Sequence, residues 1–203
     1  MFKLQTSNFK LQTSNLRHVC VWLRRIAHCR GFGIQSPSDY WFVRYVINEH
    51  WPYYSYESIG KNDDWLTRKL GRLYFRLSNW RQPGTVCSEK FRVYLQAGCH
   101  SATIVSPPSP VTPKVQSSKI KVQSSKVELM LIPVDGHHRQ QLDDIYNKVD
   151  DRSVVIIDGI HRDWDFWHEV TTDKRTGVTF DLYYCGLVMF DKKRVKKNYI
   201  INF

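Results

Sequence analysis

The chain has 203 residues, of which 42% are hydrophobic and 14% aromatic, and its formal net charge is +11. This size and composition argue for one globular domain with a sizeable core. No apolar run approaches the ~20 residues of a membrane helix, and no apolar segment follows Lys3 and Lys10 as in a secretory signal. The five cysteines form no C-x-x-C pair, so we expect reduced thiols in a cytoplasmic protein.

A heptapeptide occurs twice in each of two distant blocks, residues 2–15 and 114–127. All four copies obey K-[LV]-Q-[ST]-S-[NK]-apolar. The blocks contain six lysines and no acidic residue, so the rest of the chain carries only +5 of the charge. The repeats are either a basic arm for polyanions or a solvated low-complexity insertion, and we favour the insertion. Since 192–197 (KKRVKK) is the only other basic cluster, nucleic acid is an unlikely partner.

The N-terminal part predicts helices. Residues 16–29 have an amphipathic pattern, with Leu16, Val19, Leu23 and Ile26 on one face. Ser36 followed by Pro37 is a helix start, and we expect Pro52 to close that helix. A longer helix follows, capped by Asn62 or Asp63 and carrying apolar residues at helical spacing: Leu66, Leu70, Leu73 and Leu77.

Short strands are predicted next, at 85–87 and within 101–105. Residues 106–113 (SPPSPVTP) indicate an extended linker, because proline removes ladder donors. We expect 106–127 to form an exposed loop or an irregular edge strand. Deleting 114–127 should then change stability little, since loop length costs only ~0.6 kcal/mol per doubling.

Two nearly identical hexapeptides follow buried apolar runs. VDGHHR (134–139) comes after Leu-Met-Leu-Ile-Pro, and IDGIHR (157–162) overlaps the end of Val-Val-Ile-Ile. Continuous apolar runs are typical of strands buried on both faces. Since residues 140–149 have helical spacing, the two runs are predicted to be neighbouring parallel strands. Their aspartates then lie at the carboxyl edge of the sheet, where ligands bind. A short helix over 163–170 and three β runs at 178–182, 186–190 and 199–203 complete the chain.

Several blocks resemble the class I S-adenosylmethionine-dependent methyltransferases, in a small O-methyltransferase-like branch of Bacteroidetes-type bacteria. They are GFGIQSPSDYWFV (31–43), YYSYESI (53–59), RKLGRLYFRLSNWRQPGTV (68–86), the two D-G-x-H-R lines, and FDLYYCGLVMF (180–190). The resemblance implies an α/β fold with a Rossmann-like, mostly parallel seven-stranded sheet, antiparallel C-terminal strands and an N-terminal helical region. The expected organisation is a repeat tail (1–15) and one domain (16–203). That domain divides into helical residues 16–82 and a core, 83–203, with an insertion at 106–127.

The cofactor motif of that family is degenerate here. The family's first turn has the form E-x-G-x-x-x-G, whereas residues 87–98 read CSEKFRVYLQAG, with Gly98 as their only glycine. No acidic residue occurs from Lys90 to Val127 to accept ribose hydroxyls. We therefore expect a methyltransferase-like protein that no longer binds S-adenosylmethionine. The alternatives are an active O-methyltransferase that uses this cofactor on a small molecule, and a basic nucleic-acid-binding or interaction protein.

The resemblance also suggests site residues. Asp135 is a candidate catalytic residue, and His161 a candidate general base. A divalent cation on Asp135 and Asp158 is conceivable, and any remaining cofactor contacts are assigned to Gly98 and His137. Alternatively, the two aspartates cap the following helices and the histidines pack at the sheet edge. Trp164 and Trp167 either stack on a planar substrate or belong to the core. The substrate, an unknown small molecule, and the oligomeric state do not follow from the sequence.

Overall fold

The computed structural model describes residues 16–107 and 126–203. Its N-terminal part is helical, as expected: a helix over 16–24 leads to η1 (Ile26–His28), α2 (Pro37–Phe42), the π-helix η2 (Val43–Ile47), η3 (Tyr54–Glu57) and the long α3 (Trp65–Arg81). Ser36 caps α2 through its hydroxyl, as its sequence predicts. The cap of α3 is Asp64 and neither Asn62 nor Asp63, because Asp64 accepts the backbone N–H groups of Leu66 and Thr67.

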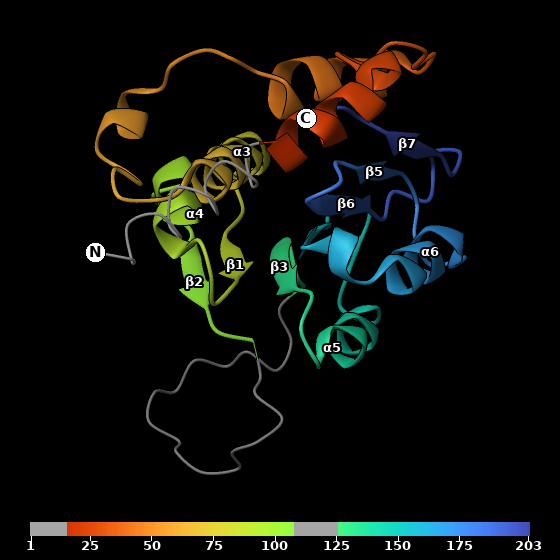
Figure 1. Cartoon of the computed structure of the whole chain (residues 1–203). Coiled ribbons are helices and arrows are strands. Elements are labelled where there is room, and N and C mark those ends of the chain that lie inside the picture. Colours follow the sequence, from red (N-terminus) through yellow and green to blue (C-terminus); the bar gives the residue numbers. More distant parts are fainter. Residues whose placement is uncertain (1–15, 108–125) are drawn as a thin grey trace.

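The remaining elements form one sheet with helices around it (Figure 1). Its strands are β1 (Thr85–Cys87), β2 (Thr103–Val105), β3 (Leu129–Pro133), β4 (Val154–Asp158), β5 (Thr179–Asp181), β6 (Cys185–Met189) and β7 (Asn198–Ile200). The helices between them are α4 (Arg92–Gly98), α5 (His138–Ile145), η4 (Ile160–Arg162) and α6 (Trp164–Thr172). The spatial order of the strands is β2-β1-β3-β4-β6-β5-β7.

The fold class predicted from the sequence is confirmed. The strand pairs β1–β2, β1–β3, β3–β4 and β5–β7 are parallel, and β6 runs antiparallel to both of its neighbours. The two runs that precede the hexapeptides are adjacent parallel strands, with Pro133 opposite Asp158. Both strands therefore end at the same edge of the sheet, as the repeated sequence predicts.

The seven strands are not distributed as the resemblance implies. Among the described residues, β2 is an edge strand with β1 as its only neighbour, and no strand lies between β2 and β3 in sequence. At the opposite edge of the sheet, β7 pairs with β5. The prediction of a loop over 106–127 falls mostly outside the described residues. Val127 is an exception, because its N–H donates to the carbonyl of Lys148 and its own carbonyl accepts the Ser153 hydroxyl. A deletion should therefore spare Val127.

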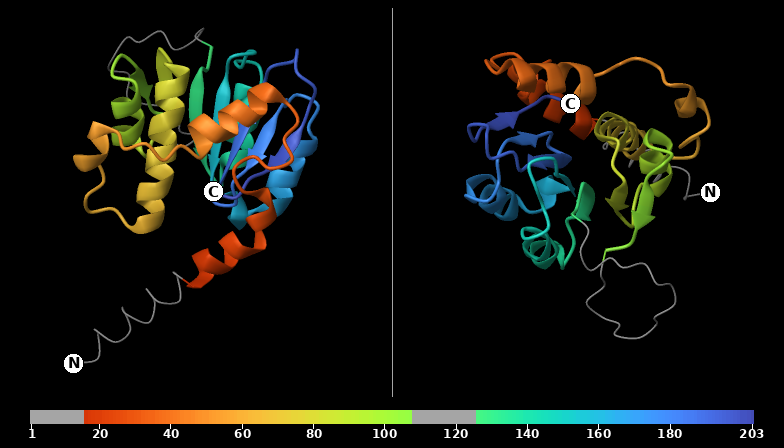
Figure 2. Two further views of the ribbon diagram at one scale, coloured as in Figure 1. Left: turned by 90° about the horizontal axis from the view of Figure 1, so that it is seen from above. Right: turned by 180° about the vertical axis from the view of Figure 1, so that it is seen from behind.

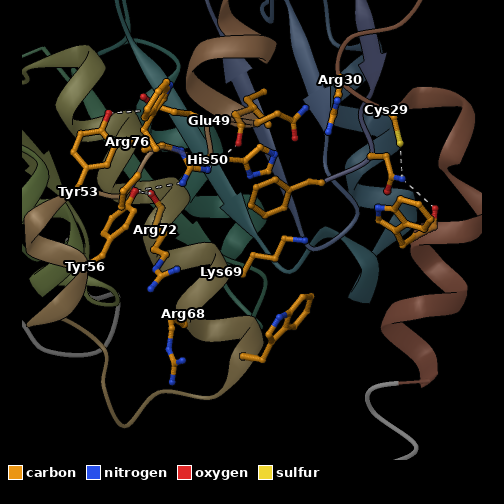
Figure 3. Close-up of a pocket in the computed structure, with 18 of the residues that line it drawn as sticks. Cys29, Arg30, Glu49, His50, Tyr53, Tyr56, Arg68, Lys69, Arg72 and Arg76 are labelled. Carbon is orange, nitrogen blue, oxygen red and sulfur yellow. Dashed lines mark hydrogen bonds between the residues drawn. The ribbon is translucent and has the colours of Figure 1, made fainter.

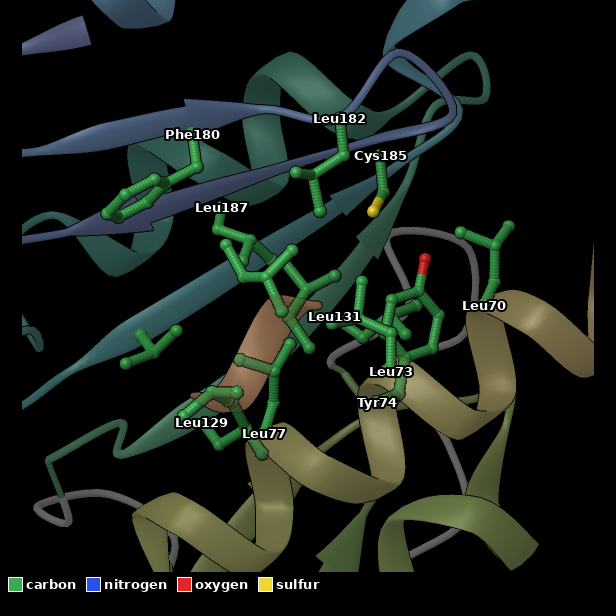
Figure 4. Close-up of a cluster of buried hydrophobic side chains, with 14 of the residues drawn as sticks. Leu70, Leu73, Tyr74, Leu77, Leu129, Leu131, Phe180, Leu182, Cys185 and Leu187 are labelled. Carbon is green, nitrogen blue, oxygen red and sulfur yellow. The ribbon is translucent and has the colours of Figure 1, made fainter. Parts of the chain in front are cut away.

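Two hydrophobic clusters hold helices against the sheet. The side chains of β3 alternate between them: Leu129 and Leu131 pack under α3, while Met130 and Ile132 pack under α5 and α6. Figure 4 shows the first cluster, in which Leu73 and Leu77 of α3 meet the sheet. The second cluster is smaller and includes Leu142, Ile145, Phe166 and Trp167.

The N-terminal helix contacts the domain near both of its ends, since His18 hydrogen-bonds to the Tyr184 hydroxyl and packs against the Trp65 ring. Its predicted apolar face is exposed, with Leu16, Val19 and Leu23 all more than half accessible. Figure 2 shows this helix projecting from the rest of the domain. Asn202 contacts the C-terminal end of this helix and the turn after it. The backbone N–H of Asn202 donates to the carbonyl of His28, and the side-chain amide of Asn202 donates to the carbonyl of Trp22.

Candidate functional site

A cavity of about 590 Å³ lies at the carboxyl ends of β1 and β4. We call it the rim pocket. One wall is the start of α3 with the segment before it, and a second is residues 90–94, which span the end of the turn after β1 and the start of α4. The remaining wall consists of Asp158 at the end of β4, residues 159, 161 and 162 that follow it, and Tyr184. The volume is within the ~300–1,000 Å³ typical of small-molecule sites. Of the predicted site residues, the structure brings Asp158 and His161 together in this pocket.

Asp158 is the buried acid of the rim pocket, with 9% of its surface exposed. The hydroxyl of Tyr74, from α3, donates to its Oδ1 over 2.7 Å. Burial raises the pKa of this carboxyl, while the Tyr74 hydrogen bond and the positive charges of Lys90 and Arg162 act in the opposite direction. The interpretation of Asp158 as a helix cap is not supported, because within the described residues its carboxylate accepts a hydrogen bond from the Tyr74 hydroxyl and not from a backbone N–H of the following helix.

The sequence analysis did not find Tyr74. The signal was present, since Tyr74 lies four residues after Leu70 and one after Leu73, on the apolar face of the long helix. A buried tyrosine needs a partner for its hydroxyl, and an acid at the edge of the sheet is such a partner.

His161 lies on η4 and lines the rim pocket together with Asp158, the last residue of β4. Burial lowers the pKa of its imidazole, with further contributions from Arg162 and Arg17. Its ring stacks on Tyr183, with centroids 5.4 Å apart and planes at 14°. Its buried Nδ1 has no hydrogen-bond partner among the described residues. A neutral imidazole with a free nitrogen is suited to general-base chemistry.

Asp135 and His137 do not line the rim pocket. Both are exposed, and the Asp135 carboxylate accepts the backbone N–H of His137 over 2.9 Å, just before α5. This contact supports the alternative in which Asp135 orders the start of the helix. No group of three or more histidine, cysteine or acidic side chains suited to a metal ion occurs in residues 16–107 and 126–203. A cation bound by Asp135 and Asp158 therefore has no supporting ligand set within the described chain.

The turn after β1 keeps a glycine-like backbone but carries large side chains. Phe91 is left-handed (φ 57°, ψ 21°), a conformation that glycine adopts without cost and that costs other residues about 1–3 kcal/mol. Its ring packs edge-on against Tyr74 at 4.8 Å. The ring of Tyr94 fills the space beside Gly60 and Gly71, where an added Cβ would lie less than 3 Å from it.

Arg92 bridges this turn to the end of β2. Its Nε donates to the carbonyl of Ser88 over 3.1 Å, and its second nitrogen donates to the hydroxyl of Ser106 over 3.0 Å. Ser106, which directly follows β2, therefore already has a cationic hydrogen-bond partner.

Gly98 lies at the last position of α4, away from the rim pocket. A Cβ on this residue would approach the backbone carbonyl oxygen of Phe75 to 2.3 Å. Gly98 therefore permits α4 to pack closely on α3, and its position favours that role over contact with a cofactor. Trp167 is 5% exposed and belongs to the core, whereas Trp164 is 44% exposed and leans on Tyr183.

Comparison with known proteins gives one structural likeness. A search of family models and a search of curated proteins both found no match. The fold resembles the crystal structure of a methyltransferase from Geobacter sulfurreducens, with a TM-score of 0.46, 14% sequence identity, and coverage of 66% of this chain and 86% of the other. No helix in the described part of the chain is long and apolar enough to cross a membrane.

Proposed function

We propose that this chain is a methyltransferase-like protein that has lost S-adenosylmethionine binding and keeps a small-molecule site in the rim pocket. The observation that carries the proposal is the turn after β1. Its left-handed residue is Phe91, and its helix begins with Arg92 and Tyr94, whose side chains are tied to Ser106 and Asp63. Side chains occupy the space into which a cofactor must bring its ribose and carboxylate close to the backbone.

The lost contacts are energetically sufficient to abolish binding. A hydrogen bond to a charged group contributes about 1.5–3 kcal/mol, which is roughly a ten- to hundredfold change in affinity. The ribose-binding acid is replaced by Ser106, and its hydroxyl is already engaged by Arg92. Moving Phe91 or Tyr94 aside would add the cost of removing packed rings from Tyr74 and Gly71.

The rim pocket retains groups that recognise a small polar molecule. Asp158 offers an acid whose pKa is raised by burial, and His161 offers a base whose pKa is lowered by burial. Lys90 and Arg162 add positive charge at the same walls. A ligand that carries a hydroxyl and a negative charge matches this combination.

Titration calorimetry with S-adenosylmethionine and S-adenosylhomocysteine tests the loss of the cofactor. We expect no saturable heat up to 1 mM of either compound, a range that corresponds to binding weaker than about −4 kcal/mol. The proposal is wrong if either compound binds with micromolar affinity and this binding is lost in Asp158→Ala but kept in the exposed control Asp151→Asn. That result would show that the chain still binds the cofactor.

The alternative is an active O-methyltransferase, and the position of His161 beside Asp158 favours it. In that case a neutral His161 would accept the proton of a substrate hydroxyl, and S-adenosylmethionine would supply the methyl group when bound. Release of S-adenosylhomocysteine with a panel of catechols and phenols, abolished by His161→Asn, would support this activity. No release with any phenol in the panel is the result that the degenerate proposal expects.

A further inference from the structure

A second and larger cavity, of about 900 Å³, lies on another face of α3. We call it the α3 pocket. Its floor is the row Trp65, Arg68, Lys69, Arg72 and Arg76, whereas the rim pocket uses Leu66, Thr67 and Leu70 of the same helix. Segment 47–57 and the C-terminal residues 202–203 form the walls, as Figure 3 shows for the labelled side chains.

Two arginines of the floor are already engaged by the backbone. Arg76 donates to the carbonyl oxygens of Val46 and Ile47 over 2.7 and 2.8 Å. Arg68 donates to the carbonyls of Gly60, Lys61 and Asp63. Arg76 thus holds the wall of the pocket at Ile47, and Arg68 holds the segment 60–63 before α3, so both are structural cations.

Lys69 and Arg72 are different, because neither forms a salt bridge within the described residues. The Lys69 ammonium lies 4.9 Å from the ring centre of Trp65 and 4.6 Å from that of Phe203. The Arg72 guanidinium lies 4.8 Å from the ring centre of Tyr56, and its buried Nε lacks a hydrogen-bond partner in the part of the chain described. Neighbours on one helix face, they point into the same cavity (Figure 3).

Two cations without a counter-charge are costly in a partly buried site. Burial, together with a smaller effect of the Arg76 charge, lowers the pKa of Lys69 to about 8. The acids of the pocket offer little compensation, since Glu57 is exposed and neither Glu49 nor Glu57 is among the charges that act on the pKa of Lys69. An anion between Lys69 and Arg72 would restore the charge balance and use the free donor of Arg72.

Flat aromatic side chains line the same cavity and remain accessible. Trp51 is 75% exposed, Tyr54 97% and Trp65 52%. Large exposed rings around a concave surface indicate a ligand-binding role, because single domains usually bury such side chains. Rings of this kind stack on planar ligands, with a gain of about 1–3 kcal/mol for a nucleobase.

We propose that the α3 pocket binds a small molecule in which a planar aromatic ring carries a phosphate or carboxylate group. Lys69 and Arg72 hold the anionic group, and the ring stacks on Trp51 or Trp65. This site is separate from the rim pocket and does not depend on what the rim pocket binds. A phosphate and a carboxylate present the same acceptor oxygens to the two cations, so the probes must distinguish them.

The test uses two matched pairs of probes, adenosine monophosphate with adenosine and indole-3-acetate with indole. Binding is followed by tryptophan fluorescence and by calorimetry at pH 7. We expect at least one anionic probe to bind at least tenfold more tightly than its neutral partner. Lys69→Met and Arg72→Met should each lower its affinity at least tenfold, while the exposed control Lys192→Met should not change it. The pair that responds identifies the anion.

Several outcomes would overturn the proposal. The proposal fails if both anionic probes bind with dissociation constants above 1 mM, or if each anionic probe binds no more tightly than its neutral partner. It also fails if neither methionine variant changes the affinity, or if a single-stranded oligonucleotide binds and none of the small probes does. The last would indicate a nucleic-acid surface. Thermal melting of each variant verifies its fold, and Asp158→Asn, in the rim pocket, should bind the probe like the wild type. Failure here therefore leaves the rim-pocket proposal untouched.

Discussion

The phenol ring of Tyr94 lies directly against the backbone of Gly71 on the neighbouring helix. A Cβ placed on Gly71 would come within 2.5 Å of two carbon atoms of that ring. The hydroxyl at the other end of the ring donates to Asp63 over 2.7 Å. The large ring of Tyr94, which follows the turn after β1, thus fills the space that a side chain on Gly71 of α3 would need. This part of the chain therefore belongs to the core and is not a loose loop.

A double-mutant cycle tests this match. Helix propensity alone predicts that Gly71→Ala stabilises α3 by about 1 kcal/mol. We expect the opposite, a loss of about 1–3 kcal/mol, because the new methyl group overlaps the Tyr94 ring. In a Tyr94→Ala background the same change should become stabilising. Urea unfolding of the four proteins measures the coupling, and additive effects would contradict the packing that we describe.

The Asp158 carboxyl predicts a stability change that depends on pH. Its pKa is raised by burial, so its contribution to stability is present below the unfolded value of 3.8 and is lost as pH rises through the folded pKa. At neutral pH the ionised form destabilises the fold, whereas an asparagine can still accept the Tyr74 hydroxyl. Asp158→Asn should therefore raise the melting temperature at pH 8 more than at pH 5, at about 2–4 °C for each kcal/mol.

An equal change at both pH values would show that Asp158 is already ionised in the fold at pH 5, so that burial does not raise its pKa as described. Asp151→Asn provides the control, since the Asp151 side chain is exposed. Its melting temperature should follow the wild type at both pH values within the error of calorimetry.

Gly98→Ala separates packing from ligand binding. Its methyl group would meet the carbonyl oxygen of Phe75 at 2.3 Å, and backbone cannot move away as a side chain can. We expect destabilisation of about 1–3 kcal/mol in urea unfolding. A variant that unfolds like the wild type but loses a ligand would instead return Gly98 to a cofactor-binding role.

Arg76 is predicted to be the strongest structural cation of α3. It is 7% exposed and donates to two carbonyl groups at the end of η2. Arg76→Met should cost about 3 kcal/mol or more, because both buried acceptors lose their partner. Arg76→Lys should recover part of the loss, and the exposed Arg24→Met should cost almost nothing. Melting temperatures of the three variants give the ranking; equal values for Arg76→Met and Arg24→Met would refute it.

Local sequence determined the central pair of strands and the start of α2. Val154–Ile157 and the run before Pro133 are continuously apolar, which suits strands covered on both faces, and the helical segment between them leaves only parallel pairing. Ser36 before Pro37 placed a helix start for an equally local reason, as the first turn needs an acceptor and tolerates proline. These features depend on neighbours within a few residues or on the period of the apolar pattern.

Tertiary structure alone decided which of the two aspartates belongs to a site. Asp135 and Asp158 have nearly the same local sequence, yet Asp135 is exposed and Asp158 is buried against Tyr74, 84 residues earlier in the chain. The pKa of an acid follows its solvation and its partners, and these come from α3 and the turn after β1. The α3 pocket is likewise invisible in the sequence, because its cations and aromatic rings meet only when segment 47–57 and residues 202–203 fold onto α3.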